Sequence, residues 1–372
     1  MSERGERGAS AALGSEPRAT YGGLRPVRTL CMLSIVAYHV RWTGVDPPEP
    51  LLGISFGLTT LQVILCALVA RAGSAPPAGP FLARRARRLL RPWLLWSAVY
   101  VAVKVAQSLR YGHGWSDQLD GSMVMVGGSF HLWFLPYGFA ASGLALAGLH
   151  LTRGRRAAAG AWAGGLLGAV VLLLGTVSQR ALAPPPPLAL WLDGAPALLF
   201  GLAIGRALSV ERPDTRRRLL MAVSALSLLP VLLGAYVAPE SQLWARYAVA
   251  VPLACAGFLV RCPDVPLLTW LAERNMGVYV VHVLALQAVD RVDVLGDLPD
   301  LGRILSVYVL SLGAASITAS VSGAAGRALS ARRRERSDAG QRGASTHAGG
   351  APGMAAGSAP GAAAPQSRMR AS

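Results

Sequence analysis

Ten long apolar runs constrain what this sequence can fold into more than any other feature. Each is close to the roughly 20 residues that an α-helix needs to cross about 30 Å of hydrocarbon, and short polar connections separate them. The runs are 26–45, 51–70, 89–108, 130–150, 159–178, 188–206, 219–238, 246–261, 275–291 and 303–325. The sequence therefore predicts an all-α, polytopic bundle of about ten transmembrane helices and a multi-pass location in the cell membrane.

The charge of the chain fits the same interpretation. Charged residues make up only 15% of the sequence, and the formal net charge is +17. A basic balance can indicate nucleic acid as a partner. The arginines, however, lie in connections and tails rather than along an amphipathic helix. We therefore expect membrane lipid, and no nucleic acid, around this protein.

The arginines also predict an orientation. If the N-terminus is cytoplasmic, the cytoplasmic connections carry 16 arginines and the outer connections carry 6. This bias, together with an even number of spans, places both termini in the cytoplasm. The expected organisation is a disordered cytoplasmic tail at 1–23, a transmembrane domain at 24–326 and a second disordered cytoplasmic tail at 327–372.

Two ionisable residues in the first run are the sharpest candidates for chemistry. Eleven helical positions from Arg28 to His39 turn the chain by roughly 1100°, about 20° past three full turns, and rise about 16 Å. Both side chains therefore share one helix face, where an extended anionic donor could lie with its reactive end at the imidazole. The simpler interpretation is an arginine that extends to the membrane surface and a histidine bonded to a neighbouring helix.

Five segments, in order, resemble membrane acyltransferase family 3. The segments are Arg28 to His39, Arg84-Arg85-Ala86-Arg87-Arg88 followed by Pro92-Trp93, His131-Leu132-Trp133, Gly201-Leu202-Ala203-Ile204-Gly205-Arg206, and Gly277-Val278-Tyr279-Val280-Val281-His282. Each is a weak signal alone, but their order on a ten-span frame is specific. One element departs from the family pattern, because Gly53-Ile54-Ser55-Phe56-Gly57 stands near the place of the usual Ser-Gly-Phe.

The resemblance implies an integral-membrane O-acyltransferase. Such an enzyme would move an acyl group, expected to be acetyl, from acyl-CoA (acetyl-CoA) to a hydroxyl of a carbohydrate, a glycolipid or a secondary metabolite. Arg28, Arg85 and Arg88 would hold the anionic part of the donor. His39 would act as general base, or carry the acyl group itself. We expect no metal, because the histidines show no paired ligand spacing.

Four further residues are candidates for substrate binding: His131, Trp133, Tyr279 and His282. Tyr279 and His282 lie three residues apart, so both can face one cavity. Ordinary roles are the alternative for all of them, as interfacial side chains or as bonds between helices. The basic segment could likewise serve only topology and anionic headgroups.

Two other functions stay open. An acyltransferase relative without activity would explain the altered second run. A transporter or other non-enzymatic membrane protein would predict internal repeats and interrupted helices in matched halves. The two halves of this sequence show no clear repeat.

Overall fold

The computed structural model describes residues 21–42, 55–71, 76–112, 114, 121–152, 156–182, 185–237 and 242–320. The predicted C-terminal tail lies outside the described residues, as does most of the predicted N-terminal tail. Residues up to Thr318 form one compact unit.

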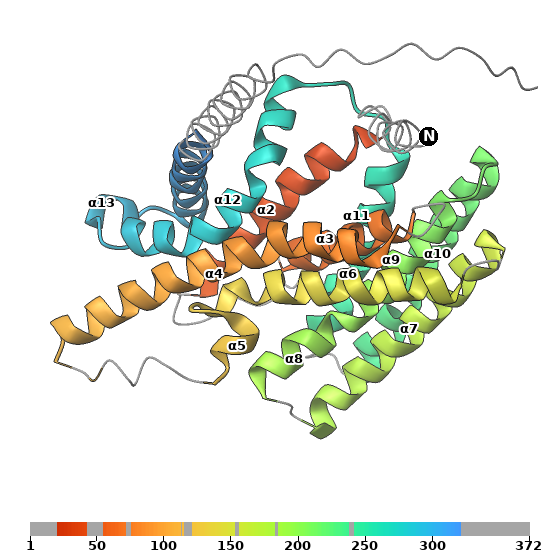
Figure 1. Cartoon of the computed structure of the whole chain (residues 1–372), viewed down its shortest axis with the longest axis horizontal. Coiled ribbons are helices and arrows are strands. Elements are labelled where there is room, and N and C mark those ends of the chain that lie inside the picture. Colours follow the sequence, from red (N-terminus) through yellow and green to blue (C-terminus); the bar gives the residue numbers. More distant parts are fainter. Residues whose placement is uncertain are drawn as a thin grey trace, which may run out of the picture. The chain divides into compact units, whose positions relative to one another are not determined.

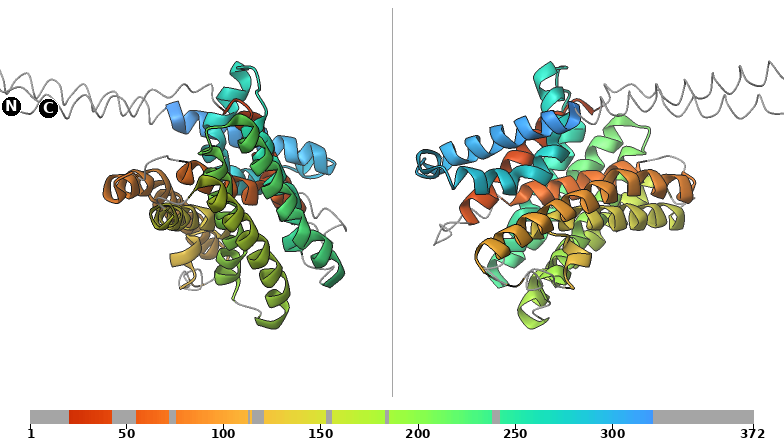
Figure 2. Two further views of the ribbon diagram at one scale, coloured as in Figure 1. Left: turned by 90° about the vertical axis from the view of Figure 1, so that its right-hand side faces the viewer. Right: turned by 60° about the vertical axis from the view of Figure 1, so that its left-hand side comes forward.

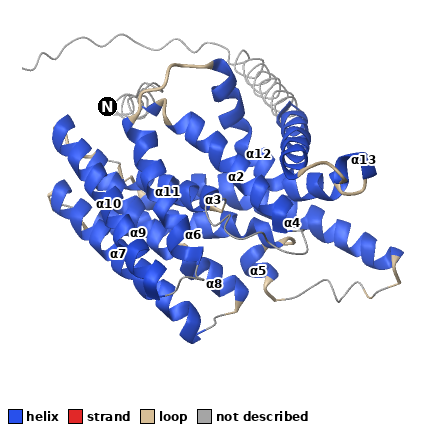
Figure 3. Ribbon diagram, turned by 180° about the vertical axis from the view of Figure 1, so that it is seen from behind, coloured by secondary structure: helices blue, strands red, loops and turns tan. Residues whose placement is uncertain are grey.

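Every regular element in the described part of the chain is a helix (Figures 1 and 3). In chain order these are α2 (Leu24–Trp42), α3 (Phe56–Ala70), α4 (Ala78–Arg110), α5 (Met123–Val126), the 3₁₀ turn η4 (Phe130–Trp133), α6 (Phe134–Leu151), α7 (Ala157–Leu182), α8 (Pro186–Asp193), α9 (Ala195–Leu208), α10 (Pro213–Val237), α11 (Gln242–Leu259), α12 (Pro266–Val289), α13 (Asp293–Gly296) and a helix at Asp300–Ser320. The all-α prediction is confirmed.

Six described helical segments are long and apolar enough to cross a membrane, judged by length and composition. They are Ala78–Arg110, Phe130–Leu151, Ala157–Thr176, Leu188–Leu208, Pro213–Gly234 and Asp300–Ser320. Phe56–Ala70 and Leu243–Leu259 are apolar but shorter. The count of ten spans and the cytoplasmic termini therefore remain predictions.

The two other long helices, α2 and α12, are less apolar because of their polar residues. α2 carries Arg25 and Arg28 near its start, and α12 carries Glu273, Arg274 and Asn275 in its middle. These helices also supply two of the candidate site histidines. The polar residues that lower the hydropathy of α2 and α12 thus lie on the same helices as two of the candidate histidines.

The predicted span 188–206 contains a break that its hydropathy does not reveal. α8 ends at Asp193 and α9 begins at Ala195, with Gly194 between them. Pro196 lies in the first turn of α9, where its missing N–H costs nothing, whereas a continuous helix would lose a hydrogen bond there. Two backbone carbonyls at the break accept tyrosine hydroxyls: Gly194 from Tyr137, and Asp193 from Tyr247.

Packing centres on α3, which contacts α2, α6, α9 and α11. Figure 2 shows the bundle from two further sides, with α4 alongside α6. One buried apolar cluster joins the first half of α2 to α3, α7, α9, α10 and α11. A second joins α2, α4, α6, α12 and the helix Asp300–Ser320.

α4 continues further than the predicted span 89–108, because the basic segment before it is helical as well. The helix has 33 residues, of which only Leu89, Tyr100 and Ser108 are buried. Arg85 is partly buried, while Arg84, Arg87 and Arg88 are exposed. The basic segment is therefore a rigid extension of the helix that reaches the candidate site.

Gly201 and Gly205 allow close packing of two helices. Both glycines of α9 lie against α3, where an added Cβ would collide with Cys66 at one position and with Ala70 at the other. Small residues at this spacing let two helix backbones approach closely, which is a main source of association between helices in a bilayer.

We predict that Gly201→Val destabilises the protein by about 2 kcal/mol or more, because the new side chain must push α9 away from α3. Three buried cysteines (Cys31, Cys66 and Cys255) allow a direct measurement, since a maleimide dye reacts with them only as the purified protein unfolds on heating. Gly313→Ala is the control, because nothing lies within 4 Å of its added Cβ. Equal unfolding temperatures for the two variants would contradict the packing argument.

Candidate active site

Three histidines that are far apart in the sequence meet in the interior. They are His39 near the end of α2, His131 in η4 and His282 in α12. The ring centroids of His39 and His282 are 4.6 Å apart, those of His131 and His282 5.0 Å, and those of His39 and His131 6.2 Å. Each pair meets edge to face.

Hydrogen bonds assign the protons on two of these rings. Nδ1 of His282 lies 2.7 Å from the carbonyl oxygen of Tyr279, which can only accept, so this nitrogen donates. Nε2 of a neutral His282 is then an acceptor, 3.3 Å from Nδ1 of His39. The His39 Nδ1 also lies 2.9 Å from the carbonyl oxygen of Ile35. It therefore carries the proton, and Nε2 of His39 keeps its lone pair.

His131 is held from two sides. Its Nδ1 lies 2.9 Å from the hydroxyl oxygen of Ser129, and its backbone carbonyl accepts a hydrogen bond from the hydroxyl of Tyr279. Tyr100 of α4 packs against the ring at 5.0 Å between centroids and donates its hydroxyl to the carbonyl of Val280 in α12. Nε2 of His131 is buried and has no hydrogen-bond partner in the described part of the chain.

Two glycines before η4 allow this arrangement. Gly127 has φ +86°, which side-chain-bearing residues rarely adopt. Gly128 lies so close to α4 that an added Cβ would overlap the carbonyl of Ser97. The chain can therefore turn directly beneath α4 and deliver His131 to the other two histidines.

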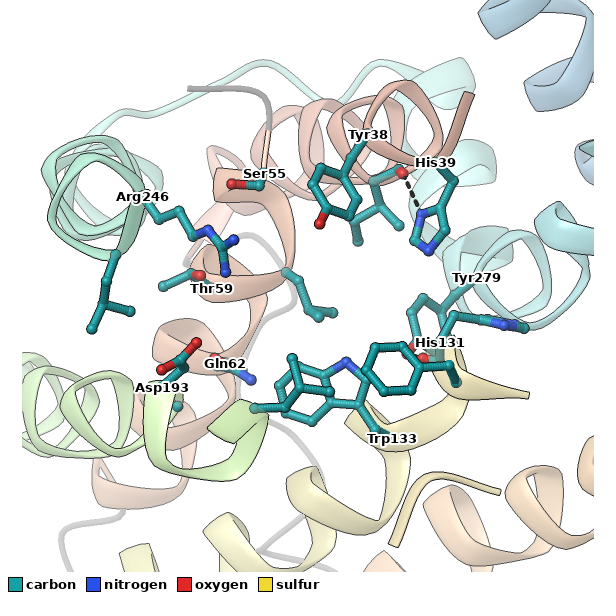
Figure 4. A pocket seen from close by; sticks show the side chains of 16 residues that line it. Tyr38, His39, Ser55, Thr59, Gln62, His131, Trp133, Asp193, Arg246 and Tyr279 are labelled. Atoms are coloured by element: carbon teal, nitrogen blue, oxygen red, sulfur yellow. Dashed lines mark hydrogen bonds between the residues drawn. The ribbon is translucent and has the colours of Figure 1, made fainter. Parts of the chain in front are cut away.

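A cavity of about 120 Å³ opens beside the histidines. Figure 4 shows His39 pointing down toward His131 and Tyr279, with Trp133 along the floor. The remaining polar and aromatic lining residues are Tyr38, Ser55, Thr59, Gln62, Phe130, Asp193 and Arg246. His282 does not line the cavity, but it contacts three residues that do, His39, His131 and Tyr279.

The three predicted donor-binding arginines form a separate group. Arg28, at the other end of α2 from His39, interacts electrostatically with Arg88, and Arg88 interacts with Arg85. No described acidic side chain forms an ion pair with any of the three. Like charges held together without a counterion favour an anionic ligand.

The structure thus brings the predicted residues into two groups. His39, His131, Trp133, Tyr279 and His282 lie at or next to the cavity, and the three arginines lie apart from it. The bond between His39 and His282 also matches the simpler interpretation of each as a partner between helices. The geometry alone does not assign their roles.

Sequence reasoning missed two charged residues at the cavity, Asp193 and Arg246. Asp193 falls within a predicted span and Arg246 is the first residue of another, and an ionisable residue inside a span usually marks a functional site. That signal was present in the sequence. Among the described residues, no group of three or more His, Cys, Asp or Glu side chains has the arrangement to hold a metal ion.

Comparison with known protein families identifies the class of protein that this helical fold and site define. The sequence model of one family, described as an acyltransferase domain, matches residues 22–322. The chain belongs to this acyltransferase family, membrane acyltransferase family 3, as the five sequence segments predicted. No curated protein matches the chain, and no solved structure does.

We predict that Tyr279→Phe lowers the free energy of unfolding by about 1 kcal/mol, because the carbonyl of His131 loses its buried donor. Tyr308→Phe is the matched control, since the Tyr308 hydroxyl is buried with no hydrogen-bond partner in the described residues. Its loss should leave stability unchanged or raise it. Thermal unfolding followed with the maleimide dye measures the stability of both variants. Equal effects would count against the hydrogen bond from Tyr279 to the carbonyl of His131.

Proposed function

We propose that this membrane acyltransferase moves an acetyl group from acetyl-CoA to a hydroxyl of a carbohydrate or related acceptor, in the cell membrane. The observation that supports the proposal most is the hydrogen bonding of the histidine pair. It leaves Nε2 of His39, the nitrogen not engaged by Ile35 and His282, as a base on a cavity-lining residue. Membership of an acyltransferase family supplies the reaction class.

In this proposal Nε2 of His39 takes the proton of the acceptor hydroxyl as its oxygen attacks the thioester carbon. The C–S bond then breaks, and His39 returns the proton to the CoA sulfur, giving an ester and free CoA. His282 is a positioning residue, because its Nε2 accepts from Nδ1–H of His39 and stabilises the imidazolium that forms. An acyl-histidine route would use the same nitrogen of His39 as nucleophile.

His131 completes the proposed reaction centre. When the Ser129 hydroxyl donates to Nδ1 of His131, the proton of the neutral imidazole is on Nε2. This Nε2 is buried and has no hydrogen-bond partner among the described residues. A donor at that position can stabilise the negative charge that develops on the thioester oxygen. Trp133 and Tyr279 then bound the space for the acyl group.

The arginine group supports the choice of a phosphate-bearing donor. Arg28 and His39 share one face of α2, separated by a rise of about 16 Å, a distance that suits an extended donor. Arginine's planar fork binds phosphate oxygens in pairs. In this proposal Arg28, Arg85 and Arg88 hold the phosphates of CoA, while the thioester reaches the histidines.

We predict that purified protein releases labelled acetate or an acetyl ester from acetyl-CoA, and that His39→Ala lowers this rate by about 100-fold or more. Arg28→Ala should lower it too, through weaker donor binding. His150→Ala is the control, because His150 is exposed at the end of α6. Substrate flux that survives both changes would indicate a transporter, and a wild type that leaves acetyl-CoA intact would indicate an inactive relative.

We predict that Arg85→Ala and Arg88→Ala each raise KM for acetyl-CoA by about tenfold, because each removes a charge-assisted contact to phosphate. The same changes should leave KM for acetyl-pantetheine, which lacks those phosphates, unaltered. Arg87→Ala is the matched control, since this exposed side chain bonds back to Ala83 on its own helix. Equal effects on both donors would rule out phosphate recognition.

A further inference from the structure

The end of the cavity away from the histidines is polar, and the reaction proposed above does not use it. Ser55 directly precedes α3, which supplies Thr59 and Gln62, while α8 supplies Asp193 and α11 supplies Arg246. Figure 4 shows these side chains gathered opposite His39 and Tyr279. Hydrogen-bonding groups are thus concentrated at one end of a single cavity.

Burying the polar side chains at this face of α3 costs free energy unless they form hydrogen bonds. Its three residues follow a spacing of four and three, which places them on one side of the helix. The Gln62 side chain is only 3% exposed, and no described residue bonds to its amide. The hydroxyl of Ser55 is also buried without a partner in the described part of the chain. Buried polar groups are normally satisfied, so these two need an explanation.

Tyr247 connects the chain segments that carry Asp193 and Arg246. The hydroxyl of Tyr247 donates to the carbonyl of Asp193 at 2.6 Å and accepts the N–H of Ala197 at 3.0 Å, which spans the break between α8 and α9. Tyr247 also directly follows Arg246 in α11. One tyrosine therefore links the backbone of α11 next to Arg246 with the backbone of Asp193.

The charges favour a neutral ligand rather than an ion. One carboxylate and one guanidinium line the same end of the cavity, so their charges offset each other. An amide, a hydroxyl, a carboxylate and a guanidinium together offer both donors and acceptors. Adjacent hydroxyls on a sugar ring also donate and accept, whereas a simple alkanol has one hydroxyl and could not satisfy both the Gln62 amide and the Ser55 hydroxyl.

We infer that Gln62, Asp193 and Arg246, with Ser55, form the subsite for the non-reacting hydroxyls of a glycosyl acceptor and so present one hydroxyl to His39. The inference rests on the proposed acyltransferase function. It assigns a binding role to the part of the second predicted span that departs from the family pattern.

The test compares two fates of the acetyl group from labelled acetyl-CoA, transfer to an acceptor and hydrolysis by water. The probes are a set of n-octyl glycosides (glucoside, galactoside, mannoside and rhamnoside), with n-octanol as the acceptor that lacks ring hydroxyls. Gln62→Leu and Asp193→Asn remove subsite groups. Thr60→Val is the control on the same helix, because Thr60 is buried, bonds to Phe56 and does not line the cavity.

We expect at least one glycoside to accept acetyl at least tenfold better than octanol. Each subsite variant should lower the ratio of transfer to hydrolysis by about tenfold, and Thr60→Val should leave that ratio unchanged. Hydrolysis by the wild type with no preference for any glycoside would overturn the subsite and spare the proposed function. An equal fall in transfer and hydrolysis in the variants would also overturn it. No reaction of acetyl-CoA at all would overturn the proposed function itself.

Discussion

Four tyrosine hydroxyls hold the site together, each by donating to a backbone carbonyl of another helical element. Tyr100 donates to Val280, Tyr279 to His131, Tyr137 to Gly194 and Tyr247 to Asp193. Inside a bundle a polar group must find its partner on protein, and a tyrosine can reach across a helix interface while its ring stays in the apolar core. These bonds link α4 to α12, α12 to η4, α6 to the break between α8 and α9, and α11 to α8, so they help to fix the backbone on several sides of the cavity.

The proposed chemistry depends on this fixed backbone because imidazoles act only in a defined orientation. The bond from Tyr279 places the backbone of His131, while the Tyr279 carbonyl assigns the proton on His282. Nε2 of His282 in turn lies 3.3 Å from Nδ1 of His39. One tyrosine thus touches two of the three histidines and reaches the third through its neighbour, which links a structural bond to the state of the proposed base.

Much of the fold followed from sequence. Apolar length predicted the helices, and the shared face of Arg28 and His39 is realised within one uninterrupted helix, α2. The break at Gly194 was not predicted, because the run stays apolar on both sides and the local signals, Gly194 and Pro196, also occur in intact helices.

The meeting of His39 with His282 could not be derived from spacing either. Helical periodicity gives the face of a residue, whereas the helix that this face meets depends on tertiary packing. Asp193 and Arg246 were visible as charges in apolar runs, but only packing shows that they line one cavity.

The two ends of the cavity are built from different helices. The histidines project from α2, η4 and α12, and the polar end comes from α3, α8 and α11. Changes in the second group can therefore reshape what the cavity accepts while the imidazoles keep their geometry. A scaffold divided in this way can acquire new acceptors during evolution without rebuilding its reaction centre, and the altered second run of this chain is where such divergence would first be visible.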